Sequence, residues 1–115
     1  MKRRLRAVGS GPSAAEAVPA LVAALKDPGE GIRRHVANVL GRLGPAAAEA
    51  VPALVAALKD PNKPVRRGAA DALANIGPAA AGAVPALVAA LKDPDEIVRQ
   101  HAADALRSIQ GKSTP

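Results

Sequence analysis

The chain has 115 residues, enough for one domain, and contains neither Cys nor an aromatic residue. The absence of Cys excludes disulfide bonds and thiolate metal sites, and it fits a reducing, cytoplasmic setting. The formal net charge is +6, but the first six residues hold four of the basic side chains, and 12 basic and 10 acidic residues follow from residue 7 onward. We therefore expect no continuous basic face. No apolar run approaches the roughly 20 residues of a membrane span, so we expect a soluble chain that does not contact a membrane.

One twelve-residue string, AVPALVAALKDP, occurs three times at intervals of 33 residues, at 17–28, 50–61 and 83–94. A fixed period of this length is typical of proteins built from stacked repeats. Aligned on the string, the repeats are 12–44, 45–77 and 78–110. The remaining segments are predicted to be a partial helix and linker at 1–11 and a disordered tail at 111–115.

The first half of each repeat, called helix A here, is predicted at 13–27, 46–60 and 79–93. Its apolar residues have the i, i+3, i+4, i+7 spacing of one helical face, as Val51, Leu54, Val55 and Leu58 show. A proline falls inside each of these stretches. Either it kinks the helix, or it lies in the first turn and the alanines before it form a separate turn. The high helix propensity of those alanines favours the kink. The prolines are Pro19, Pro52 and Pro85.

The second half of each repeat, called helix B, is predicted at 30–43, 63–76 and 96–109. Gly29, Asn62 and Asp95 are suitable N-cap residues, and Gly44 and Gly77 are suitable at the helix ends. No segment shows the period-two alternation of a strand. One helix pair cannot bury its own apolar face, whereas stacked pairs can. The sequence therefore predicts an all-α fold, an α-solenoid of stacked helix pairs.

The pattern resembles the HEAT repeat, including the short HEAT-like repeats of phycobilisome lyases. The resemblance rests on a Pro in helix A, an Asp eight residues later and an Arg six residues after that. In HEAT proteins the matching Asp and Arg form a ladder between neighbouring repeats. An Asp at a helix C-terminus faces the negative end of the helix dipole, so we expect another group to hold it. The alternative is that each Asp only forms an ordinary Asp-Pro turn. The resemblance implies this ladder for Asp27, Arg33, Asp60, Arg66, Asp93 and Arg99. Recent duplication or consensus design would both explain why the repeats are so alike, and the pattern favours design.

No enzyme signature is found in the sequence. His35 and His101 occupy the same position in different repeats, so they cannot share a metal ion. His101 and Asp104 can touch on one helix face, which is usually an ordinary surface contact. No Ser has a His and a carboxylate at the spacing of an activated nucleophile. We expect no catalytic residue, no cofactor and no bound metal.

Helix B varies most on its polar side, and such variation is expected where a surface faces a partner protein or solvent. If the chain binds another protein, we expect the contact there, although a merely solvated face explains the variation equally well. The candidate residues are Arg34, His35, Asn38, Arg67, Asp71, Gln100, His101 and Asp104.

The sequence favours a non-enzymatic scaffold that binds a second copy of itself head to tail, because the repeats are nearly interchangeable and neither end carries a clearly polar capping repeat. The assembly is a ring if the rotation between copies closes and a filament if it does not. The alternative is nucleic-acid binding through Lys2, Arg3, Arg4 and Arg6, which the lack of aromatic residues disfavours. An enzyme resembling the bilin lyases is a third hypothesis, supported only by the repeat resemblance.

Overall fold

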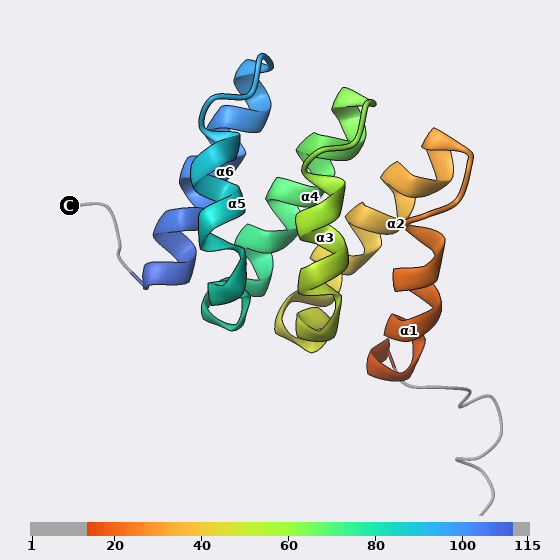
Figure 1. Ribbon diagram of the computed structural model, residues 1–115. Coiled ribbons are helices and arrows are strands. Elements are labelled where there is room, and N and C mark those ends of the chain that lie inside the picture. The colour runs from red at the N-terminus through yellow and green to blue at the C-terminus, as the bar shows by residue number, and fades with distance from the viewer. Residues whose placement is uncertain (1–13, 112–115) are drawn as a thin grey trace, which may run out of the picture.

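The structure, a computed structural model, describes residues 14–111, and these form helices joined by short turns. The helices are α1 (Ala14–Ala24), α2 (Glu30–Leu43), α3 (Val51–Ala57), α4 (Lys63–Ile76), α5 (Val84–Ala90) and α6 (Glu96–Gln110), with 3₁₀ helices η1 (Gly44–Ala50) and η2 (Gly77–Ala83). No strand occurs within this range. Three antiparallel helix pairs stack side by side, so the predicted α-solenoid is confirmed (Figure 1). The predicted partial helix at 1–11 and most of the predicted tail lie outside the described residues.

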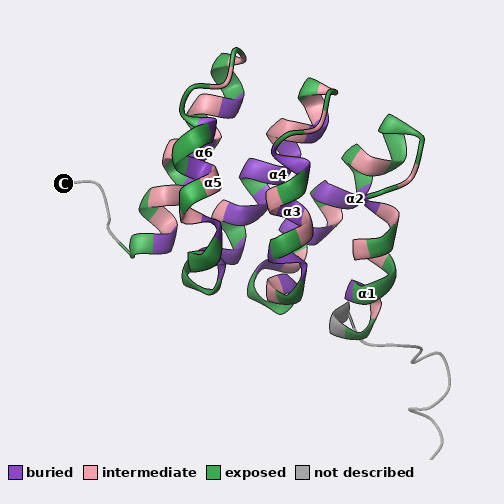
Figure 2. Cartoon of the chain, in the orientation of Figure 1, coloured by how far each residue is buried: buried purple, intermediate pink, exposed green. Residues whose placement is uncertain are grey.

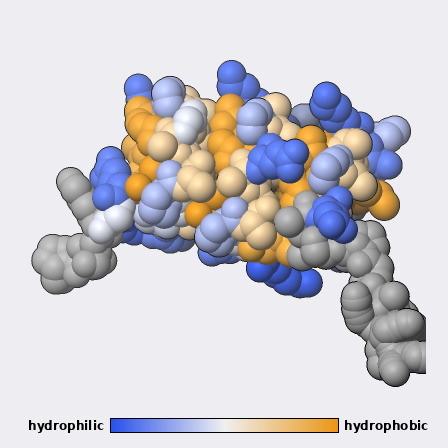
Figure 3. All heavy atoms as spheres, turned by 90° about the horizontal axis from the view of Figure 1, so that it is seen from below, coloured by the Kyte–Doolittle hydropathy of each residue, from blue (hydrophilic) through white to orange (hydrophobic). Residues whose placement is uncertain are grey.

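The helix pairs form two layers. Helices α1, α3 and α5 make the helix A layer, and α2, α4 and α6 make the helix B layer, in which α4 packs against both of its neighbours. Buried residues follow the lines where adjacent helices meet, and the central repeat has the most of them (Figure 2). Figure 3 shows the molecule from below. On this face hydrophobic and hydrophilic residues lie side by side, and no continuous hydrophilic surface covers the hydrophobic ones.

Small residues fill the core between the repeats. Leu54, Leu73 and Leu87 are fully buried among alanines, and no charged or polar side chain in the described part of the chain is buried with them. A Cβ atom added at Gly68 would lie 3.2 Å from the Cβ of Ala37, closer than most side chains tolerate. The lack of larger residues at these positions lets the helix B backbones approach closely.

The predicted kink at the helix A prolines is wrong in the second and third repeats. There α3 and α5 begin one residue before Pro52 and Pro85, so each proline lies in a first turn, where its missing N–H is not needed. The alanines before them form η1 and η2, which contain non-helical backbone at Ala47 and Ala80. The alternative prediction, a separate turn, therefore holds in these two repeats. In the first repeat Pro19 lies within α1.

The predicted ends of helix B agree with the structure. The side chains of Asn62 and Asp95 accept hydrogen bonds from the N–H groups of Val65 and Val98, at 3.1 and 3.0 Å, and thereby cap α4 and α6. Gly44, Gly77 and Gly111 follow the three helices with φ of 59°, 74° and 69°. This left-handed backbone ends each helix and favours glycine.

Two stretches, Glu30–Ala57 and Lys63–Ala90, are long and apolar enough by composition to cross a membrane. Each stretch contains a positive-φ glycine and a 3₁₀ helix, and the chain reverses direction there (Figure 1). Each stretch is therefore two antiparallel helices, and the stacked helices of a solenoid require the same apolar composition.

Candidate functional site

A repeating ion pair joins each repeat to the next at the start of helix B. The Nε and Nη2 atoms of Arg33 donate to the two carboxylate oxygens of Asp60 at 2.8 and 3.1 Å. The Nη1 atom of Arg33 donates to the backbone oxygens of Asp27 and Pro28 in its own repeat. Asp60 also accepts a 2.8 Å hydrogen bond from the N–H of Asn62. One arginine therefore binds the turn of its own repeat and the turn of the following one.

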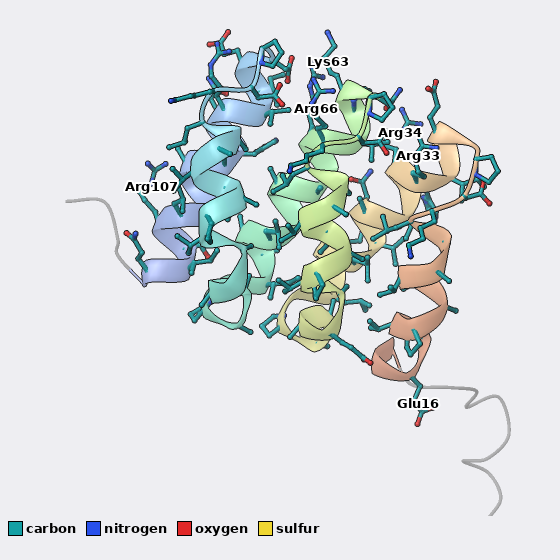
Figure 4. All side chains as sticks on the ribbon, viewed as in Figure 1. Glu16, Arg33, Arg34, Lys63, Arg66 and Arg107 are labelled. Atoms are coloured by element: carbon teal, nitrogen blue, oxygen red, sulfur yellow. The ribbon has the colours of Figure 1, made fainter. Side chains whose placement is uncertain are left out.

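Arg66 repeats this arrangement one repeat further along. Its Nε and Nη2 atoms donate to Asp93 at 2.8 and 3.2 Å, and its Nη1 atom donates to the backbone oxygen of Asp60 at 2.8 Å. Arg33 and Arg66 lie along the same edge of the stack, in neighbouring helix pairs (Figure 4). We call each such Arg–Asp junction a rung. In both rungs the charged side chains are at most 15% exposed, so the pairs are largely shielded from water.

The contact between Arg33 and Asp60 changes the pKa of both side chains. The hydrogen bond with Asp60 raises the pKa of Arg33. Burial alone would raise the pKa of Asp60, but the hydrogen bonds from Arg33 and from the N–H of Asn62 outweigh burial and lower that pKa below its ordinary value. The Asp60 carboxylate therefore stays ionised in the folded chain at pH values where a free aspartate begins to protonate.

The two outermost members of the predicted ladder each make only the contacts within their own repeat. Arg99 donates from Nη1 to the backbone oxygen of Asp93, and no carboxylate among the described residues contacts its Nε or Nη2 atom. Asp27 accepts a 2.8 Å hydrogen bond from the N–H of Gly29, and no basic side chain in residues 14–111 pairs with its carboxylate. Each end of the described array thus presents half of a rung.

Further contacts between repeats involve residues that differ from repeat to repeat. The guanidinium of Arg67 makes two 2.9 Å hydrogen bonds to the carboxylate of Asp95, and the side-chain amide of Asn62 donates to Glu30 at 2.9 Å. The hydrogen bond from Arg67 lowers the pKa of Asp95 far below its ordinary value, and the same bond raises the pKa of Arg67. Sequence reasoning missed these pairs, because neither pair of residues is repeated at intervals of 33 residues.

The predicted partner surface is only partly gathered into one place. A shallow groove of about 330 Å³ lies across the helix B layer, and the carboxylate of Asp71 lies 3.9 Å from Nδ1 of His101 within it. The candidate residues that line the groove are Arg34, Asn38, Arg67, Asp71 and His101.

The other three candidate residues lie outside this groove. His35 is exposed, Gln100 donates to Glu96 at 3.4 Å, and Asp104 pairs with Arg107 on α6. Asp104 therefore has Arg107 as its partner, while His101 lies nearest Asp71 of the preceding repeat. Among residues 14–111 no three His, Asp or Glu side chains gather in a way that could hold a metal ion.

Comparisons with known proteins show the repeat family and the fold. A family model described as HEAT repeats matches the chain twice, over residues 3–67 and 51–115. No curated protein matches the chain. Among solved structures, the crystal structure of an engineered protein from a structural genomics consortium is similar, with a TM-score of 0.70 and 29% sequence identity over 84% of this chain. The match covers 46% of the engineered protein, so this chain spans about half of its length. Because the family model covers nearly the whole sequence, this chain belongs to the HEAT-repeat family.

Proposed function

We propose that this chain is a non-enzymatic protein-interaction scaffold that binds a second copy of itself head to tail. HEAT repeats and the stacked helical fold support the scaffold role. The observation that supports self-association is the half rung at each end of the described array. Among residues 14–111, the guanidinium of the last repeat has no carboxylate partner, and the carboxylate of the first repeat has no guanidinium partner.

The two half rungs are complementary in position as well as in charge. Arg99 is held by its own repeat through Nη1, as Arg33 and Arg66 are, and this leaves Nε and Nη2 for a carboxylate in a following repeat. Asp27 is held by the N–H of Gly29, as Asp60 is held by that of Asn62. A second copy placed as a fourth repeat would bring its Asp27 to Arg99 with little reorganisation of these two side chains.

Apolar residues at the two ends of the helix A layer fit the same arrangement. Leu25 and Leu58 are 7% and 5% exposed because the following repeat covers them, whereas the equivalent Leu91 is 38% exposed. Leu58 lines one groove together with Ala86, Ala89 and Ala90 of α5. The equivalent alanines on α1 are Ala20, Ala23 and Ala24, and the first two of these are exposed. A second copy would therefore offer Leu91 the kind of surface that covers its counterparts.

Charge reversal at the proposed rung tests this function. Analytical ultracentrifugation of the full chain from micromolar to millimolar concentration is expected to show an average mass that rises with concentration. The Arg99→Asp and Asp27→Arg variants should each associate more weakly, because each places like charges at the junction. An equimolar mixture of the two variants should recover association, because each variant then complements the other at both ends.

The control is Arg34→Asp, which makes the same charge change at a side chain that pairs with no described residue and that lies within the array rather than at its end. This variant should associate like the unaltered chain. A mass equal to the monomer at every concentration, or association that the two reversals leave unchanged, would refute head-to-tail binding through these residues.

A further inference from the structure

The helix B layer ends differently from the helix A layer, and Arg107 marks the difference. Within the array, Gly41 and Ala74 occupy the position of helix B that faces the next repeat. A Cβ atom added at Gly41 would lie only 3.3 Å from the Cα of Ala72, and the backbone oxygen of Ala74 accepts a 2.7 Å hydrogen bond from Ser108. The space at this position accommodates at most a methyl group. In the last repeat the same position holds Arg107, which points away from the other repeats (Figure 4).

The opposite end of the helix B layer also carries larger residues than the junctions within the array. Ala72 and Ala105 are buried where α4 and α6 meet the preceding helix B. The equivalent residue in the first repeat is Val39, and the exposed Arg42 stands where Ser108 reaches Ala74 in the last repeat. A second copy stacked like a fourth repeat would therefore place Arg107 against Val39 and Arg42.

We infer that Arg107 is a built-in stop that weakens head-to-tail stacking of this chain on a second copy, an inference that rests on the proposed self-association. The Arg107 side chain is about half exposed and pairs with Asp104, which is also about half exposed. If a second copy stacked as the repeats within the chain do, the guanidinium would be buried in a space that fits only a methyl group, which is sterically unfavourable. It would also lie beside another positive charge while shielded from water, which is electrostatically unfavourable. The helix A layer and the rung favour association, and the helix B layer opposes it.

The stop has a specific structural consequence. A second copy can satisfy the half rung only if Arg107 swings away from its Asp104 partner or if the two helix B layers stay apart. Either way, the area that stacking buries is smaller than that of a junction within the chain. We therefore expect short, weakly held assemblies of the unaltered chain and long assemblies once the stop is removed.

Removing the stop tests the inference. Arg107→Ala restores the residue found at position 74, and Val39→Ala combined with Arg107→Ala also restores, on the opposite side of the junction, the alanine found at positions 72 and 105. Sedimentation equilibrium should give dissociation constants at least about tenfold lower for Arg107→Ala, and lower again for the double variant. The control Arg107→Lys keeps a long cationic side chain and should associate like the unaltered chain. Thermal unfolding followed by circular dichroism verifies that each variant is folded.

The outcomes separate this inference from the proposed function. If Arg107→Ala associates no more tightly than an unaltered chain that does associate, the stop is refuted and self-association stands. If the unaltered chain is monomeric but Arg107→Ala associates, and Arg99→Asp abolishes that association, the stop is supported and only native self-association fails. If no variant associates, both are refuted.

Discussion

The Arg66 side chain makes hydrogen bonds to two repeats at once. Its Nη1 atom binds the turn of its own repeat, while Nε and Nη2 bind Asp93 of the next. Because the surrounding residues exclude most water from this pair, removing the guanidinium leaves the Asp93 carboxylate with only its hydrogen bond from the N–H of Asp95, and it removes the donor to two backbone oxygens. The stability lost by removing one partner is therefore larger than the net contribution of the intact pair to the free energy of unfolding.

Replacing Arg66 by Met is expected to lower the free energy of unfolding by about 2 kcal/mol, because Met keeps the apolar stem and removes only the charge-assisted hydrogen bonds. Urea denaturation followed by circular dichroism measures the change. Arg34→Met is the matched control, since Arg34 pairs with no described residue, and it should change stability by less than about 0.5 kcal/mol. Equal effects of the two substitutions would show that the rung contributes nothing beyond an ordinary surface charge.

The stability of the fold is expected to fall in acid because of the lowered pKa values of Asp60 and Asp95. A carboxyl whose pKa is lower in the folded than in the unfolded state stabilises the fold fully above the unfolded value of about 3.9. That stabilisation is lost as pH falls below this value and through the folded-state pKa. Melting temperatures should therefore be nearly constant from pH 7 to pH 5 and should decrease below about pH 4.

The Asp95→Asn variant separates the contribution of Asp95 from that of the other acids. It should melt at a lower temperature than the unaltered chain at neutral pH, and the difference should shrink below about pH 4. Because Asn keeps the N-cap hydrogen bond, as Asn62 does in α4, a difference that stays constant over the whole range would show that the ionisation of Asp95 does not contribute to stability.

At the residue scale, the resemblance to HEAT repeats implied that the repeated Asp and Arg form a ladder. The structure adds that each arginine reaches the aspartate 27 residues later rather than the one in its own repeat. Spacing alone does not specify that choice, since both aspartates are near the arginine. The Arg67–Asp95 pair could not be predicted, because the first repeat has Gly29 and the second has Asn62 at the position of Asp95.

At the element scale, the ends of the helices were easier to predict than the course of helix A. Asn62 and Asp95 cap helices through local hydrogen bonds, so the sequence suffices to place them. The break before Pro52 and Pro85 depends instead on Ala47 and Ala80, which are buried against neighbouring helices. Tertiary packing there overrides the helix propensity of alanine.

The glycine at the end of helix B offers a test of backbone geometry. Gly77→Ala should destabilise the chain by about 1–3 kcal/mol, because Gly77 has φ of 74° and ψ of −143°, a region that other residues rarely adopt. Gly82→Ala is the matched control: it lies in η2, and a Cβ there would meet no atom within 4 Å. This control should be neutral or slightly stabilising, and thermal unfolding compares the two. Similar losses at both positions would contradict the role given to the backbone at Gly77.

At the scale of the whole molecule, stability comes from contacts between neighbouring repeats. Helix α4 packs against α2 on one side and α6 on the other, and its buried residues surround more of the helix than those of either neighbour. In such an array the central repeat is supported on both sides and the outer repeats on one. The exposed Leu91 and Ile32, at 38% and 50%, show the incomplete cover at the two ends.

Leucines at equivalent positions should therefore contribute different amounts to the stability of the fold, depending on the repeat in which they lie. Leu58→Ala is expected to cost about 2–3 kcal/mol, because the side chain is covered by the following repeat, while Leu91→Ala should cost less than about 1 kcal/mol. Hydrogen exchange should likewise show the slowest amides in α4. Equal costs at the two leucines would indicate that something covers Leu91 in solution, and ultracentrifugation of the same sample would show whether it is a second copy.

The junctions also determine how the length of this chain could be changed. The central repeat, 45–77, carries both an Arg and an Asp that form rungs. It also carries a leucine that the next repeat covers and alanines that face the previous repeat. Additional copies of this 33-residue segment, inserted after residue 77, should therefore fit against one another without any new side chain. Each insertion would lengthen the array by the same increment and raise the denaturant midpoint of unfolding. The rise in midpoint per insertion should become smaller as the array grows, because the two weakly supported end repeats become a small fraction of it.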